Sequence, residues 1–228
     1  MSIGGQVSEL IEGFRKLRFG ALISIISVII AFASLAILFF TVGFAFPTIH
    51  PAPIFHMFSG VAITMMTVML VASALSLIAF ILWFMATGNL KRYNPDRFGI
   101  GRLGLLLQVI GIILIFAGSL AFVGVAFAQG SNIAFFGVFF SFMAVIMFAA
   151  ILVLVGAILF AIMLIRLPED QNVESDFKTA GILYLIGIIL SIIPYISMVG
   201  SILILVAVIL IFTYSGSTLK RLETLPKT

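Results

Sequence analysis

Two histidines are the first candidates for chemistry, because imidazole binds metals and transfers protons near neutral pH. His50 and His56 flank a proline-rich segment, and they are the only histidines in the chain. A stable zinc site needs three or four protein ligands, typically Cys, further His or a carboxylate. The chain has no Cys, and no Asp or Glu stands near this segment. We therefore interpret the segment as a solvent-exposed loop, and we expect no metal site and no cofactor.

A second motif, Gly99-Ile-Gly-Arg-Leu-Gly104, has the G-x-G-x-x-G spacing of dinucleotide-binding loops. That fingerprint requires a preceding strand and a following amphipathic helix in a βαβ unit. Here an uncharged apolar stretch follows, so we exclude dinucleotide binding. The sequence also shows no nucleophile paired with a base, no H-E-x-x-H motif and no acidic pair within an apolar stretch. We expect a protein that is not an enzyme. The remaining alternative is catalysis by the carboxylates of the charged loops.

Gln108 is the strongest polar group within an apolar stretch. It could line a solute path, but such an amide more often bonds to a neighbouring helix. Pro194 interrupts a late apolar stretch, and a broken or re-entrant helix pair can build a binding site from freed backbone groups. The simpler alternative is a tight outer turn between two short helices. Ser191 and Ser197 flank Pro194 and would line a solute path together with Gln108.

The amino-acid composition indicates whether these residues belong to a soluble or a membrane protein. The chain has 228 residues, of which 63% are hydrophobic and 9% are charged. A soluble domain is about 45–50% apolar and about 25% charged. Too few polar groups exist to cover a soluble surface, so the sequence predicts an integral membrane protein.

The distribution of charge predicts the helices. Asp, Glu, Lys and Arg leave three uncharged runs, at 19–90, 103–165 and 179–219. A helix needs about 20 apolar residues to cross a bilayer, so the first two runs each hold two crossings. Pro47, Pro51 and Pro53 break the first run, and Gln129 to Asn132 break the second. We expect helices at 19–44, 58–87, 102–127 and 134–165.

The third run is short for two crossings and long for one. Two short helices joined near Pro194 put all 12 basic residues on one side of the membrane, as the positive-inside rule favours. A re-entrant hairpin gives the same sidedness, and one kinked helix remains a third alternative. Because none of the three runs contains Asp, Glu, Lys or Arg, we expect no machinery for proton-coupled transport, ion pumping or voltage sensing.

The predicted fold class is an all-α integral membrane protein, a bundle of about six transmembrane helices arranged as three hairpins behind a short N-terminal interfacial amphipathic helix. We expect one membrane domain over residues 1–228. Its predicted parts are the interfacial helix at 6–17 and hairpins at 19–87, 102–165 and 179–214, the last short or re-entrant around Pro194. Basic loops place both termini in the cytoplasm, with anionic headgroups of the plasma membrane as the default partner and no nucleic acid.

Small residues predict where helices approach one another. Gly104, Gly111 and Gly118 recur every seven residues, and Ala157 and Ala161 form a small-xxx-small pair. Such faces bring helices together either within a bundle or in a homo-oligomer. Packing inside the bundle is the commoner outcome in multi-pass proteins, and we favour it here.

The apolar runs also begin and end alike. Arg18-Phe-Gly20 opens the first run and Arg102-Leu-Gly104 the second, while Phe84 precedes Gly88 as Phe212 precedes Gly216. Parallel repeats of this kind occur in transporters. The alternative is that any string of helical hairpins needs basic inner ends and apolar middles, and the sequence leaves both interpretations open.

The segment Glu12-Gly-Phe-Arg-Lys-Leu-Arg-Phe-Gly20, running directly into an apolar stretch, resembles the opening of an uncharacterised archaeal family of multi-pass membrane proteins. The late proline-broken segment is similar as well. The resemblance implies an archaeal plasma membrane and brings no catalytic or binding residues. Our first functional hypothesis is a non-enzymatic membrane subunit or assembly factor that packs with other membrane proteins. The alternative is a channel or carrier for a small neutral solute.

Overall fold

The computed structural model describes residues 3–45, 54–128 and 133–224. These residues form helices α1 (Ile3–Ala45), α2 (Ile54–Tyr93), α3 (Pro95–Ala128), α4 (Ile133–Arg166), α5 (Phe177–Ser191) and α6 (Ser197–Glu223), with a short 3-10 helix, η2 (Leu167–Glu169), after α4. The prediction of an all-helical membrane protein is confirmed at this level, because five of the helices are long and apolar enough to cross a bilayer.

The exception is α5. It has 15 residues, or about 22 Å at 1.5 Å per residue, which is shorter than a hydrocarbon core of about 30 Å. The third apolar run is therefore two helices joined by a turn at 192–196 rather than one kinked helix. About six transmembrane helices were predicted; the described ranges hold six α-helices, five of which reach spanning length.

The first helix corrects one prediction. Residues 6–17 are not a separate interfacial helix, because α1 continues without a break for 43 residues. The apolar side chains of this segment were expected to face the membrane interface, but protein covers most of them. Leu10, Phe14 and Leu17 are each fully buried. An amphipathic pattern specifies that one face avoids water, but it does not specify whether lipid or protein covers that face.

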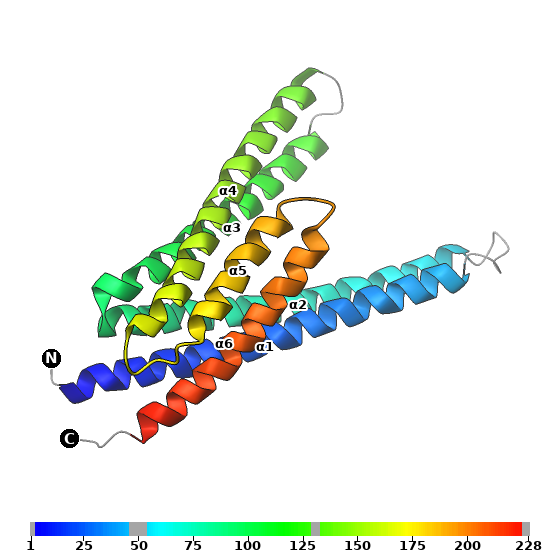
Figure 1. Ribbon diagram of the computed structural model, residues 1–228. Coiled ribbons are helices and arrows are strands. Elements are labelled where there is room, and N and C mark those ends of the chain that lie inside the picture. Colours follow the sequence, from blue (N-terminus) through cyan, green and yellow to red (C-terminus); the bar gives the residue numbers. More distant parts are fainter. Residues whose placement is uncertain (1–2, 46–53, 129–132, 225–228) are drawn as a thin grey trace.

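The helices associate as pairs of chain neighbours. Helix α1 lies along α2, α3 along α4 and α5 along α6 (Figure 1). Each pair also contacts the next, through α2 with α3 and α4 with α5, and α6 returns to contact α1. The three pairs thus close into a ring.

One end of this ring is densely packed, and we call it the base. It contains the start of α1, the end of α6, the α2–α3 corner and the linker between α4 and α5 (Figure 1). Aromatic rings fill its interior. Trp83 stacks on Phe160 at 5.3 Å between centroids, Phe160 meets the Tyr184 ring at 5.6 Å, and Phe14 meets Phe177 at 5.5 Å.

Away from the base the two longer pairs diverge (Figure 1). We call the portion of α1 and α2 beyond Ser27 and Ser76 arm A, and the portion of α3 and α4 beyond Gly111 and Ala149 arm B. Among the arm side chains that the structure describes, Ala72 alone is buried. The α5–α6 pair is too short to follow the arms, so their outer parts gain no third helix pair.

Candidate functional site

The four residues predicted to line a solute path do not come together. Gln108 lies within α3 against α4, where a Cβ atom added at Gly156 would stand 2.8 Å from its Cγ. The Gln108 side chain is buried, and its Nε2 has no hydrogen-bond partner in the described structure. The Pro194 turn instead connects α5 and α6.

The two serines beside Pro194 bond locally. The Ser191 hydroxyl donates to the Ile188 carbonyl at 2.7 Å, and the Ser197 hydroxyl donates to the Pro194 carbonyl at 3.0 Å. Such bonds return a side chain to its own helix or turn. These hydroxyls therefore stabilise the turn and are engaged there.

The three glycines predicted as a packing face lie between α3 and α4. A Cβ at Gly104 would stand 2.5 Å from the Gly156 carbonyl oxygen, and one at Gly111 would stand 2.8 Å from that of Ala149. Gly118 is looser, with Val145 Cγ1 at 3.3 Å. Ala157 and Ala161 on α4 are also buried. The close approach of the two helix backbones requires glycine where α3 and α4 cross nearest the base.

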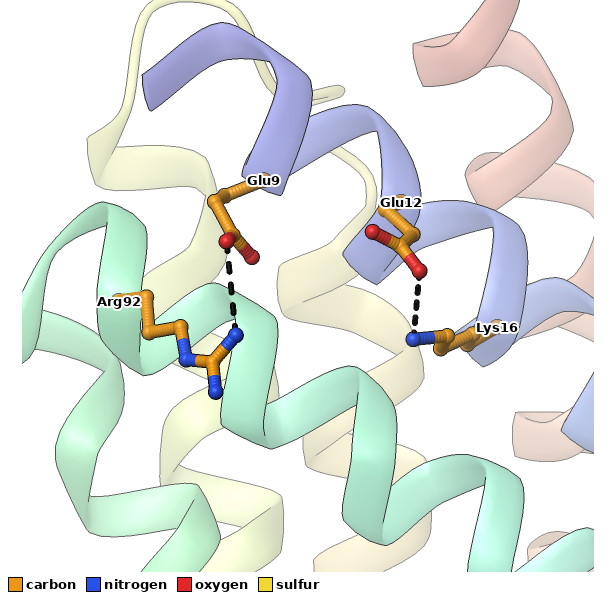
Figure 2. Close-up of polar contacts among 4 residues, drawn as sticks. All are labelled: Glu9, Glu12, Lys16 and Arg92. Carbon is orange, nitrogen blue, oxygen red and sulfur yellow. Dashed lines mark ion pairs between the residues drawn. The ribbon is translucent and has the colours of Figure 1, made fainter. Parts of the chain in front are cut away.

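The candidate metal ligands His50 and His56 fall outside the described residues. Within the described ranges, no group of three or more His, Cys, Asp or Glu side chains could hold a metal ion. Some charged side chains of the base form ion pairs. Lys16 Nζ lies 2.7 Å from Glu12 Oε1, and Arg92 Nη1 on α2 lies 3.5 Å from Glu9 Oε1 on α1 (Figure 2).

The α4–α5 linker is fastened to the α2–α3 corner by contacts that the sequence did not suggest. The Tyr93 hydroxyl donates to Asp170 Oδ2 at 2.8 Å, and Arg97 donates to the Glu169 carbonyl at 2.8 Å. Asp170 also accepts the Asn172 backbone N–H at 2.9 Å. Tyr93 and Asp170 are 77 positions apart, so no local pattern links them.

Two arginines make matching contacts between neighbouring helix pairs. Arg18 on α1 lies over the Phe212 ring at 4.9 Å and beside Gly216 on α6. Arg102 on α3 lies over the Phe84 ring at 5.5 Å and beside Gly88 on α2. Each arginine precedes the apolar run on the first helix of one pair, and it meets a Phe-x-x-x-Gly segment on the second helix of the neighbouring pair in the ring.

These contacts give the sequence repetition a spatial counterpart at two of the three junctions. At the third, α5 contacts α4, but Lys178 replaces the arginine and no glycine follows Phe160 at the fourth position. A Cβ at Gly181 would meet Ile165 and Leu164 of α4 at 2.7 to 3.0 Å. Close packing is therefore retained at this junction without the arginine contact.

A groove of about 310 Å³ lies between α1 and α6. Its α1 wall includes Ser24, Ala31 and Phe32, and its α6 wall includes Ser201, Leu205 and Val208. A second hollow, of about 360 Å³, lies beside Glu12, Arg15 and Lys16 near the start of α1. The first is mostly apolar, and it is the only one of these two hollows that involves two helices.

The long apolar helices and the polar base define a multi-pass helical membrane protein. A family model described as Protein of unknown function (DUF973) matches residues 10–227, so the chain belongs to that family. No curated protein and no solved structure matches the chain. The resemblance to an uncharacterised family is confirmed at this level, and the archaeal source that it implied stays a prediction.

Proposed function

We propose that this protein is a non-enzymatic membrane subunit or assembly factor whose arms hold an apolar helix of a partner membrane protein. The observation that carries the proposal is an exposed small-residue face on arm B. Ala117 and Ala121 on α3 are four positions apart and both exposed, while Phe116 and Leu120 beside them are 67% and 58% exposed. Small residues spaced this way allow a second helix backbone to approach closely within a bilayer.

The same region has no third helix pair to cover it. Gly118, between the two alanines, faces Val145 of α4, so the inner side of α3 is already occupied and the alanines lie on its outer surface. Since lipid does not drive helices together as water does, shape complementarity at small residues is the main source of association. The arms supply such a surface.

The alternative of a channel or carrier has less support from the geometry. Gln108 is enclosed by the α3–α4 pair, whereas the Ser191 and Ser197 hydroxyls bond to carbonyls of the α5–α6 turn. Aromatic rings also fill the described interior of the base. We therefore favour the partner-binding function.

The direct test is extraction from the native membrane in mild detergent, followed by native mass measurement. We expect a stoichiometric partner protein in the particle. Changing both Ala117 and Ala121 to Leu should release it, whereas Ala150→Leu, the same change at an exposed position of α4, should not. A particle that contains only this chain, as a monomer or a small homo-oligomer, would contradict the proposal.

The proposed topology places the base on the cytoplasmic side of the plasma membrane, next to anionic headgroups. In this topology, the α5–α6 pair is re-entrant: it enters the bilayer from the cytoplasmic side and returns to the same side. Support comes from exposed apolar side chains on and next to the turn, since Ile192, Tyr195 and Met198 are 57%, 98% and 68% exposed. A turn in water is usually built from polar residues and glycine.

The backbone of this turn also meets the demand of a lipid environment, where unpaired N–H and C=O groups are costly. The N–H groups of Ile193 and Ile196 donate to Leu190 and Ile193 carbonyls at 3.2 and 3.1 Å, and Gly200 N–H donates to the Ile196 carbonyl at 3.1 Å. The Ser197 hydroxyl adds its bond to Pro194. The turn therefore needs few hydrogen bonds from water.

Single cysteines can test this arrangement without background, because the chain has no Cys. A membrane-impermeant maleimide applied to intact cells should label Thr48→Cys, in the predicted outer loop, and should leave Tyr195→Cys and Ser217→Cys unlabelled. Opening the cells should expose Ser217→Cys alone. Labelling of Tyr195→Cys from outside would show that the third pair crosses the membrane.

A further inference from the structure

The groove between α1 and α6 has the shape and chemistry of a lipid-binding site. Figure 1 shows α6 crossing α1 near the base. Away from the crossing, the N-terminal part of α6 leads to the turn with α5, while α1 continues into arm A. The two helices contact each other near the base and part beyond it, and the groove opens between them. Its volume of about 310 Å³ falls within the range of small-molecule sites, about 300–1,000 Å³.

The α1 wall of the groove lies within the candidate membrane span Val7–Ser34. The α6 wall, from Ser201 to Val208, lies within the candidate span Ser197–Glu223. Its polar lining is limited to the hydroxyls of Ser24 and Ser201. The Ser201 hydroxyl is already bonded, at 3.0 Å, to the Ser197 carbonyl. Water has little to bind in such a groove, so hydrocarbon is the appropriate occupant.

A positive charge stands at the base end of the same helix interface. The Arg18 guanidinium lies over Phe212 and beside Gly216 of α6, and the ion pairs found among the described residues do not include it. A ring contact uses the face of a guanidinium, while its N–H donors point outward in the guanidinium plane. Ser24 is six positions further along α1, about 9 Å at 1.5 Å per residue.

We propose that this groove binds one anionic phospholipid, with an acyl chain between α1 and α6 and the headgroup phosphate on Arg18. A guanidinium is suited to this role because it matches phosphate oxygens with two parallel N–H bonds. The order of parts also matches a lipid in the inner leaflet, with charge at the base and the apolar groove deeper in the bilayer.

A second copy of the chain fits the groove less well than a lipid. Any apolar helix that this chain could insert comes from the runs 19–90, 103–165 and 179–219, none of which contains Asp or Glu. Such a helix would cover the groove and leave Arg18 without a negative partner. A lipid phosphate supplies both the apolar chain and the missing charge.

The chain contains a matched control for the headgroup contact. Arg102 makes the same contact with Phe84 and Gly88 on α2, but it does not stand at the end of the α1–α6 groove. Arg18→Gln should weaken binding of an anionic lipid, and Arg102→Gln should leave it unchanged. Ser201→Phe should fill the groove and weaken binding of the acyl chain.

The measurement is native mass spectrometry of the purified full chain, titrated with phosphatidylglycerol or with phosphatidylcholine of the same acyl chains. We expect one phosphatidylglycerol per chain, bound about tenfold more tightly than phosphatidylcholine. Arg18→Gln should lower the affinity about tenfold, or about 1.4 kcal/mol. Inorganic phosphate alone should not bind, because it lacks the chain that fills the groove.

Two results would overturn the inference. The first is equal affinity of the native chain for both lipids, which needs no variant and is independent of whether Ser201→Phe folds. The second is a protein partner that Ser201→Phe releases, because the groove would then hold a helix. The site lies on α1 and α6, so loss of the partner from the Ala117/Ala121 face leaves this proposal intact.

Discussion

The base and the arms share the long apolar helices α1 to α4, yet they differ in how those helices pack. In the base, Phe160 and Ala161 are fully buried, and α3 meets α4 through facing glycines. In arm B, on the same two helices, Phe116 and Met147 are both 67% exposed. Hydrophobicity therefore brings the helices into the bilayer, and small residues with interlocking rings decide where they pack.

The largest expected difference between the two regions is at a buried aromatic residue. Phe160→Ala in the base removes a ring that contacts both Trp83 and Tyr184, and the cavity should cost about 3 kcal/mol. Phe116→Ala on arm B should change stability by less than about 0.5 kcal/mol. Thermal unfolding in detergent, followed by circular dichroism, measures both. Equal losses would mean that the arms are as tightly packed as the base.

The next effect distinguishes glycines of one seven-residue series. Gly104→Ala places a Cβ within 2.5 Å of the Gly156 carbonyl oxygen, and the helices must separate at a cost of about 1–3 kcal/mol. Gly118→Ala meets nothing nearer than Val145 at 3.3 Å. It should be neutral or slightly stabilising, because the exposed Val145 side chain can shift by the few tenths of an ångström that the new methyl group needs, and alanine favours helix. The same melts provide the test, and destabilisation by both changes would place the close α3–α4 contact along the whole pair.

Much of the helical framework could be predicted from the sequence, because prolines and turn residues interrupt the apolar runs. The first helix was expected to end at residue 44 and ends at Ala45, and the third was expected to end at 127 and ends at Ala128. Charge marked the ends of the apolar runs but not of the helices, since α1 begins at Ile3 rather than 19, α2 ends at Tyr93 rather than 87, and α3 begins at Pro95 rather than 102. The local pattern could not show what covers a buried face. Residues 6–17 were predicted to lie in the membrane interface, but Leu10 and Phe14 within that segment are covered by protein.

Contacts between helices far apart in the chain could not be predicted from local sequence patterns. Closure of the ring by α6 on α1 joins the two ends of the chain, and no periodicity encodes it. The Arg-x-Gly and Phe-x-x-x-Gly repeats did carry a signal, since Arg18 meets Phe212 in the structure. The signal could not be used without knowing which helices are neighbours.

A smaller effect concerns the fastening of the base. Tyr93→Phe removes the hydrogen bond to Asp170, which should cost about 1 kcal/mol and loosen the α4–α5 linker. Faster hydrogen exchange at residues 170–176 would report this, measured by mass spectrometry. Tyr195→Phe is the control, because Tyr195 is 98% exposed. Unchanged exchange in Tyr93→Phe would show that Arg97 and η2 hold the linker without the tyrosine.

The smallest effect is expected at the polar surface of the base. Glu12 pairs with Lys16 one turn along α1 (Figure 2), and an exposed pair of this kind contributes little because water and salt screen it. Glu12→Gln should leave the unfolding midpoint within experimental error at both low and high salt. A clear loss at low salt that disappears at high salt would contradict this, and would mean that charge pairs stabilise the base alongside its aromatic rings and glycines. The expected result instead attributes the order of the base to its buried side chains, because Ala72 is the one buried side chain among those described in the arms.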